Sequence, residues 1–285
     1  MYNGTLKLKR PDQTTYSTLS LAPADGVLIS TIRELTSVSA NLSTAVRSTG
    51  VGETIRGYTI KGKPLVVQGR ILDDNKPLKD ELLSIVQAGN EGTLELDCQA
   101  VGVSSASKTQ YCIDVVVKDA PDISQENHSK FSFTLYAPIP YWRAKTKTSI
   151  TGFVNNVSKP TAGYLGNVES DYTLTFKASA SMTKATFTMG GRTLILNFST
   201  AVTSGTEVVF TRKENGRVVL TVGGVEHNEY IDLTNTTLWL LPVRAPLGAT
   251  LKVEGSSGIA LSSSKLEYYT RYGSVMTWGD VDNGN

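Results

Sequence analysis

The sequence predicts a mainly β protein with two domains, the first a β-barrel-like domain or sheet carrying one helix and the second a β-sandwich. Short runs that alternate apolar and polar residues recur along the whole chain, and several are separated by Gly or Asn turns. One segment alone has convincing helical spacing. The length of 285 residues fits two ordinary domains, and 40% hydrophobic with 19% charged residues is a globular composition.

The helix is predicted near residues 77–88. Its apolar residues recur at helical spacing: Leu78, Leu82, Ile85 and Val86. Pro77 suits the first helical position, Asp80 and Glu81 suit the positive end of the helix dipole, and Gly89 suits the residue just beyond the end. Strands are predicted at 64–72, 92–101 and 111–117. The Ser/Thr/Gly-rich segment from Ser37 to Tyr58 lacks periodicity and is predicted to be a long loop or an extended arm.

A strand that runs into a proline-locked aromatic corner lies near the middle of the chain. Phe131, Phe133 and Leu135 alternate with polar residues, and the run Ala-Pro-Ile-Pro-Tyr-Trp follows, ending at Trp142. Two prolines fix their own φ and restrict the residues before them, so the strand must end here. We therefore expect a boundary between about Tyr141 and Gly166, giving domains 1–145 and 146–285. The basic run 143–148 is interpreted as a solvated strand or linker.

The second domain is predicted to be almost purely β. Strands are expected around 172–178, 185–198, 207–222, 237–242, 249–254 and 266–272, with hairpin turns at Gly190-Gly191 and Asn215-Gly216. Seven or more short strands favour two stacked sheets, because each sheet has an apolar face to cover.

No residue pattern for catalysis or cofactor binding is present, so the chain is predicted not to be an enzyme and to need no cofactor. The sequence lacks a P-loop, a nucleophile elbow and a zinc-protease helix motif. Its two histidines, His128 and His227, lie in polar loops without neighbours that would make them relays or metal ligands. The acidic run 278–285 has the wrong spacing for a calcium loop. A net charge of +2 gives no strong field for nucleic acid.

Two further groups of residues allow alternative interpretations. Cys98 and Cys112 could face each other across a hairpin that turns near Ser105, but we expect free buried thiols in a reducing cytoplasm rather than a bridge. An aromatic group near the C-terminus could form a sugar-stacking platform, although core positions are the favoured interpretation. This group comprises Tyr268, Tyr269, Tyr272 and Trp278. The N-terminus lacks the apolar core of a secretory signal, and no run reaches the ~20 apolar residues of a membrane span.

The corner F-x-F-x-L-x-A-P-x-P-Y-W ending at Trp142 resembles the end of the first domain in distal tail proteins of long-tailed, siphovirus-type bacteriophages. The helix over Leu78 to Val86, the Leu238-Trp239 strand before a turn from Pro242 to Gly248, and the closing run Leu266-Glu-Tyr-Tyr-Thr-Arg also look like that family. The likeness extends over nearly the whole length.

This resemblance implies a structural role in the virion, at the tail tip or baseplate, after assembly in the host cytoplasm. First domains would close into a ring, expected to be a hexamer, beneath the tail tube protein. Second domains, with a galectin-like sandwich, would hold receptor-binding, tip or other baseplate proteins. The interface residues are unknown at this stage, and neither nucleic acid nor membrane insertion is expected.

The alternative is a carbohydrate-binding module or adhesin that recognises cell-surface glycans. Galectins grip sugars with an H-x-N-P-R run and a W-G-x-E-x-R run. The nearest runs here start at His227 and Trp278, and they lack both arginines and the glutamate. We therefore expect the galectin-like shape without the galactoside site, as is common when a fold is reused.

Overall fold

The computed structural model describes most of the chain. The described residues are 3–35, 38–46, 53–100, 109–124, 129–153, 157, 159–160, 166, 168–189, 192–212, 217–237, 250–254, 259 and 263–276. Several predicted features lie outside the described residues. They are the turns at Ser105, Gly190-Gly191 and Asn215-Gly216, the Leu238-Trp239 strand, His128 and Trp278.

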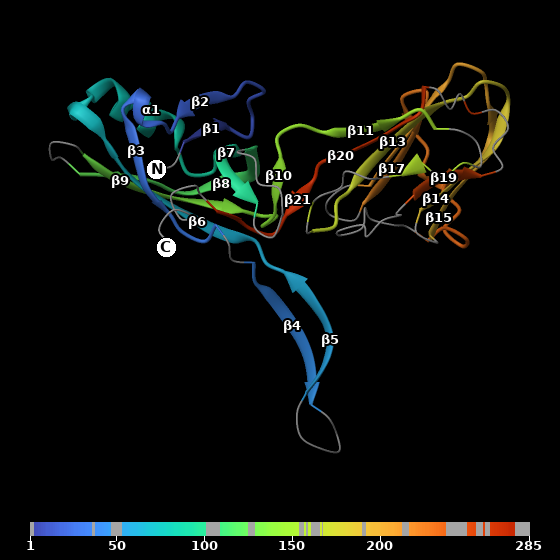
Figure 1. Cartoon of the computed structure of the whole chain (residues 1–285), viewed down its shortest axis with the longest axis horizontal. Helices are drawn as coiled ribbons and strands as arrows, with labels where there is room; N and C mark the ends of the chain where they lie inside the picture. Colours follow the sequence, from blue (N-terminus) through green and yellow to red (C-terminus); the bar gives the residue numbers. More distant parts are fainter. Residues whose placement is uncertain are drawn as a thin grey trace. The chain divides into compact units, whose positions relative to one another are not determined.

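The described chain is mainly β, with one α-helix, as predicted (Figure 1). The helix α1 spans Lys76–Ile85, and three short 3-10 helices, η1 to η3, span Pro23–Asp25, Leu72–Asp74 and Asn228–Tyr230. The strands before Thr146 are β1 Gly4–Lys9, β2 Ser17–Ser20, β3 Val27–Ile32, β4 Ala40–Val46, β5 Glu53–Ile60, β6 Lys63–Ile71, β7 Glu91–Ala100, β8 Thr109–Ile123, β9 Lys130–Ala137 and β10 Trp142–Ala144. The later strands are β11 Thr148–Thr151, β12 Lys159–Pro160, β13 Tyr172–Lys177, β14 Met182–Met189, β15 Arg192–Val202, β16 Glu207–Arg212, β17 Val218–Val222, β18 Val225–Glu226, β19 Thr250–Glu254, β20 Lys265–Tyr268, β21 Arg271–Tyr272 and β22 Val275–Met276.

The chain divides into two compact units. Unit 1 consists of Met1–Lys145 together with the segment from Tyr272 onward, and unit 2 consists of Thr146–Arg271. The expected second domain, 146–285, includes Tyr272–Met276, whereas these described residues belong to unit 1. Val275 pairs with Ala100 of β7, and the Tyr272 ring packs edge-on against Tyr111 with centroids 5.0 Å apart. Unit 2 is therefore an insertion between two segments of unit 1.

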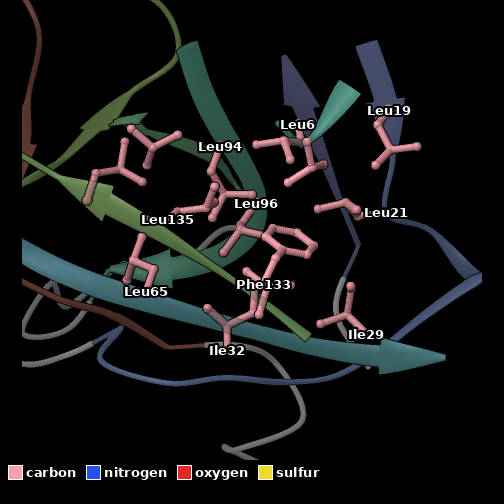
Figure 2. Close-up of a cluster of buried hydrophobic side chains, with 14 of the residues drawn as sticks. Leu6, Leu19, Leu21, Ile29, Ile32, Leu65, Leu94, Leu96, Phe133 and Leu135 are labelled. Atoms are coloured by element: carbon pink, nitrogen blue, oxygen red, sulfur yellow. The ribbon is translucent and has the colours of Figure 1, made fainter. Parts of the chain in front are cut away.

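Unit 1 is built on one antiparallel sheet in the order β2-β1-β7-β8-β9-β6-β3. The strands at the two ends of this path, β2 and β3, do not pair with each other in the described structure, so the sheet stays open. Alternation nevertheless gives each strand one apolar face, and both ends of the path contribute to the same core. Figure 2 shows Leu19 near β2, Ile29 near β3 and Phe133 of β9 gathered in that core. The arrangement is barrel-like without closure.

Helix α1 covers the core with the residues that the sequence pattern indicated. Leu82 and Ile85 are buried, and Leu78 packs against the same cluster. Asn75 caps the start by accepting a hydrogen bond from the Leu78 amide at 3.2 Å. The helix ends at Ile85, three residues before the predicted end, because Asn90 donates its side-chain amide to the Ile85 carbonyl and the chain turns into β7. Because the helix begins at Lys76, Asp80 and Glu81 lie beyond its first turn.

Unit 2 is a β-sandwich, as predicted. A six-stranded sheet has the order β11-β20-β13-β16-β17-β18, and a four-stranded sheet has the order β12-β19-β14-β15. The two sheets share one core, in which Phe176 of β13 and Phe187 of β14 lie with ring centroids 5.1 Å apart. Tyr268 is buried in this core and Tyr272 in the core of unit 1, which confirms the core interpretation for these two tyrosines.

The two cysteines are free and buried, as expected, and they do not face each other across the strand pair. Cys98 lies opposite Thr109, whereas Cys112 lies opposite Glu95. Residues three apart on a strand point to opposite faces, so the two thiols lie on opposite sides of the sheet. Burial raises the pKa of the Cys98 thiol to about 12 and also raises the pKa of Cys112.

We predict that thiol titration in denaturant without reductant finds two free thiols. In the native protein at pH 8 the same reagent is expected to react far more slowly, because burial and the raised pKa values leave little thiolate. Finding no thiols in denaturant would contradict this prediction.

Candidate functional site

The hairpin formed by β4 and β5 is the most distinctive surface element of unit 1. These two strands pair only with each other among the described strands, and Figure 1 shows them as a separate ribbon continuing from β3 and β6. The side chains described on its strands are exposed or half-buried, and Leu42 is 59% exposed. A two-stranded hairpin has little stability of its own in water. Where we expected a long loop or an arm, the chain therefore forms a paired arm.

The root of this hairpin is bonded to the sheet on its incoming side and is closed by a hydrogen bond between its two limbs. On the incoming side, the Arg33 amide donates to the Val66 carbonyl at 3.0 Å, and Glu34 adopts a left-handed backbone conformation with φ 66°. On the outgoing side, the Lys61 amide donates to the Ser39 carbonyl at 2.9 Å. A left-handed conformation is costly for a residue with a side chain, so the surrounding contacts must impose this turn.

One backbone carbonyl, that of Leu35, holds the centre of the root. The Lys63 Nζ and the Trp142 Nε1 both donate to it, each at 3.2 Å, which uses both lone pairs of the oxygen. Lys63 Nζ also lies 5.8 Å from the centroid of the Trp142 ring. Lys63 is 4% exposed and Trp142 is fully buried. Trp142, the last residue of the proline-locked corner, thus stabilises the root of the hairpin through this hydrogen bond.

The charge of Lys63 is poorly compensated at this position. Burial lowers the pKa of Lys63 to about 8, and the opposing effect of nearby Glu34 is smaller. Water is largely excluded, and the ammonium donates a hydrogen bond to a neutral carbonyl. A buried ammonium with this little compensation destabilises its charged form.

Gly62 connects the hairpin to β6 at a point with no room for a side chain. A Cβ at this position would lie 2.7 Å from the Ala137 carbonyl oxygen and closer still to the Tyr136 hydroxyl. The backbone of β9 therefore approaches the root directly. Glycine is required here by close approach rather than by its φ.

A second charged cluster holds the point where the chain leaves unit 1. Glu95 is buried and accepts Lys7 on one carboxylate oxygen and Lys145 on the other, both at 2.8 Å. Burial alone would raise the pKa of Glu95, but the hydrogen bonds from Lys145 and Lys7 outweigh it, so the pKa is lowered. Arg143 similarly pairs with Asp114 at 2.9 Å. The basic run after Trp142 is therefore anchored on the sheet at its start, rather than being a fully solvated linker.

Among the described residues, His227 is the histidine considered from the sequence, and its surroundings are those of a surface turn. His227 lies 2.7 Å from Glu229 and stacks on Tyr230, so it does have a carboxylate neighbour, contrary to the expectation, but the group belongs to a surface turn. Within the described ranges, no cluster of His, Cys, Asp and Glu could hold a metal ion. No helix in the described part of the chain is long and apolar enough to cross a membrane.

Lys63 was not among the residues predicted to be functional, although its position in the strand pattern indicated burial. Lys63, Leu65 and Val67 are alternate residues of β6, so their side chains share its inward face. Strand periodicity therefore placed a lysine on the core face, where a partner was required. The partner, a backbone carbonyl, is invisible in a residue pattern.

We predict that Lys63→Met flattens the rise of stability at alkaline pH. The pKa of Lys63 is about 8 in the folded protein against an ordinary 10.5, so between these values the unfolded chain binds more protons and stability rises with pH. The wild type is expected to gain up to about 1 kcal/mol per pH unit over the variant in this window.

Chemical denaturation at pH 8 and pH 10 measures this difference. Lys118→Met, which removes an exposed lysine, is the matched control and should keep the wild-type slope. Equal slopes for the wild type and Lys63→Met would contradict the prediction.

Comparison with known proteins gives structural neighbours only. No family model matches the sequence, and no curated protein matches it. Two structures of the phage P2 baseplate in its activated conformation, with Ca and with Sr, align over 96% of this chain and all of theirs, at TM-scores of 0.46 and 0.45 and identities of 11% and 12%.

The crystal structure of the Dit protein of phage SPP1 gives a stronger alignment. That protein is described as a paradigm of the hub adsorption apparatus in phages that infect Gram-positive bacteria. The alignment has a TM-score of 0.63 at 12% identity and covers 95% of this chain and 99% of that chain. This chain therefore has a fold similar to that of SPP1 Dit over nearly its whole length.

Proposed function

We propose that this chain is a structural distal tail protein, a hub at the tip of a long-tailed phage tail. The observation that carries the proposal is the alignment with the SPP1 Dit protein over 95% of this chain, which spans both units. The order of sequence motifs around Trp142, the helix and the closing strand supports the same family independently. Fold alone does not define function, so the proposal needs the tests below.

Within this proposal unit 1 forms the ring and unit 2 carries partners. Unit 1, which we propose to be a domain of residues 1–145 with the segment from Tyr272, would close into a hexamer beneath the tail tube protein. Unit 2 would hold tip proteins and receptor-binding or other baseplate proteins. The hairpin supports this role, because a projecting element with a fixed root suits contact with a neighbouring copy. Contact between two different surfaces of identical copies generates rings when the rotation closes.

We predict that the purified chain forms a ring whose mass is near six times that of the monomer. Light scattering over a wide concentration range, with negative-stain images, measures this. Replacing residues 41–59 by a short Gly/Ser turn should leave a folded monomer, because the root contacts on either side are kept. A wild type that stays monomeric at every concentration would count against the ring.

The carbohydrate-binding alternative has no specific observation in its favour. Tyr268 and Tyr272 are buried, so they cannot offer a stacking platform, and Tyr269 is only partly exposed. His227 is engaged by Glu229 and Tyr230.

We predict that the full chain shows no saturable binding of lactose in calorimetry. The arginines and the glutamate with which galectins grip sugar hydroxyls are absent from the runs at His227 and Trp278. A galectin titrated under the same conditions is the positive control. Saturable heat with this chain would favour the carbohydrate-binding alternative.

A further inference from the structure

A hollow lies on the outer face of the sheet of unit 1, over four neighbouring strands. Strands β3, β6, β9 and β8 are adjacent in the sheet, and each contributes to the lining of a space of about 530 Å³. Two irregularities frame it. Strand β3 bulges at Ser30, and the register between β8 and β9 shifts between Asp119 and Asp122. Because a bulge bends its strand and redirects the neighbouring side chains, the hollow follows from the course of the strands themselves.

Two cations line the hollow from neighbouring strands. Arg70 of β6 and Lys130 of β9 lie directly opposite each other in the register, and both are exposed. Like charges in this arrangement destabilise a strand pair. Neither side chain forms an ion pair with another residue in the described part of the chain. An anion bound between the two would remove their repulsion.

The neutral side chains of the hollow supply hydrogen-bond donors. Gln68 and Ser132 lie opposite each other, two residues along the strands from the cations. Ser124 Oγ accepts a hydrogen bond from the Lys130 amide at 2.9 Å, so its own hydroxyl hydrogen is left to donate. Ser30 Oγ donates to the Gln68 carbonyl at 3.0 Å, and its oxygen can still accept. Neutral donors beside two cations are the groups that bind an oxyanion.

One carboxylate limits the charge that the hollow can accept. Asp122 of β8 lies opposite Ser132, is exposed and also lines the hollow. Two cations against one carboxylate leave a single positive charge. A singly charged anion matches this balance, whereas a phosphate monoester, which carries up to two negative charges near neutral pH, would bring excess negative charge close to Asp122.

The distribution of the donors favours a phosphodiester over a carboxylate, which is also singly charged. The donors come from β6, β8 and β9 and therefore from different sides of the hollow. A phosphodiester presents four oxygens in tetrahedral directions, while the two oxygens of a carboxylate lie in one plane. The volume of about 530 Å³ is in the range of small-molecule sites and leaves room for the groups on both ester oxygens.

We propose that this hollow, which we call the Arg70–Lys130 hollow, binds the phosphodiester group of a soluble ligand. The planar guanidinium of Arg70 would hold the two non-bridging oxygens, and the Lys130 ammonium would add a point charge. Ser124 and Ser132 would donate to the remaining oxygens. The site lies within one copy of unit 1, so the inference goes beyond the proposed function and does not depend on assembly.

A lipid surface is not the expected source of the phosphodiester. Membrane-surface sites combine charge with exposed apolar side chains that enter the lipid. The apolar side chain in the lining, Phe131, is only 3% exposed. The groups that reach the hollow from the described strands are therefore polar, which suits a ligand in water.

Phosphorus NMR of dimethyl phosphate tests the site on the full chain. Dimethyl phosphate is the probe because it is a phosphodiester with one charge and no other polar group. Binding broadens its line whatever the assembly state of the protein, and a titration gives the affinity. We expect saturable broadening with the wild type and about tenfold weaker binding, or less, with the double variant Arg70→Gln/Lys130→Gln, because charge-assisted hydrogen bonds are lost.

A matched double variant controls for net charge. Lys177→Gln/Arg192→Gln also removes one lysine and one arginine, both exposed, but from unit 2. We expect it to bind the probe as the wild type does. Both double variants should keep the wild-type melting temperature, since all four side chains are exposed.

A third variant tests the charge balance. Asp122→Asn removes the carboxylate, so we expect about threefold tighter binding of inorganic phosphate at pH 8, where that ion carries two charges. The affinity for dimethyl phosphate should change less than that for inorganic phosphate.

The outcomes decide the inference independently of the hub proposal. Equal binding by the wild type and the Arg70/Lys130 variant, or equal loss in the unit 2 control, would overturn the site. Acetate that displaces dimethyl phosphate at equal concentration would overturn the choice of a phosphodiester. Vesicles of phosphatidylglycerol and phosphatidylcholine that sediment the wild type but not the Arg70/Lys130 variant would overturn the soluble ligand in favour of a lipid headgroup.

Discussion

The carbonyl group of Leu35 is the contact on which the surface architecture of unit 1 depends. It joins the entry of the hairpin, the start of β6 at Lys63 and the aromatic corner at Trp142, three segments far apart in the sequence. Because the acceptor is a backbone oxygen, the contact fixes the path of the chain as well as a side chain. The lysine contributes at a cost, since burial disfavours its charged form.

The two segments of unit 1 that flank the inserted unit 2 are each held by a side-chain contact within unit 1. The chain leaves unit 1 at Lys145, which Glu95 of β7 holds, and it returns at Tyr272, whose ring packs on Tyr111 of β8. Both ends of the insertion are therefore attached to one pair of neighbouring strands. Ion pairing fixes one end and aromatic packing contributes to the other, so protonation of Glu95 in acid weakens the first of them.

The parts of the fold that periodicity determines could be predicted from the sequence. Alternation located β6, β7, β9 and the hairpins of unit 2, and helical spacing located α1, because both patterns follow from which side of an element is buried. The end of α1 was misplaced since a side chain, Asn90, caps it from outside the helix. The path of Tyr272 and the opposite orientation of the two cysteines depend on strand register, which no local pattern contains. The candidate site was the least predictable part, because its centre is a backbone carbonyl.

Several strand edges in the described chain carry features that limit pairing with other chains. Strand β3, at one end of the sheet of unit 1, is interrupted by a bulge between Ile29 and Thr31. Strand β15 is covered by residues 231–237, which bond to Thr193 and Ile195. Such devices keep a β protein from pairing with other chains. The hairpin also has a register shift, between Ser43 and Thr44, but among the described strands its two strands pair only with each other, and Leu42 is 59% exposed. The hairpin therefore differs from these sheet edges in its exposed Leu42, which suits the contact with a neighbouring copy that the proposed ring requires.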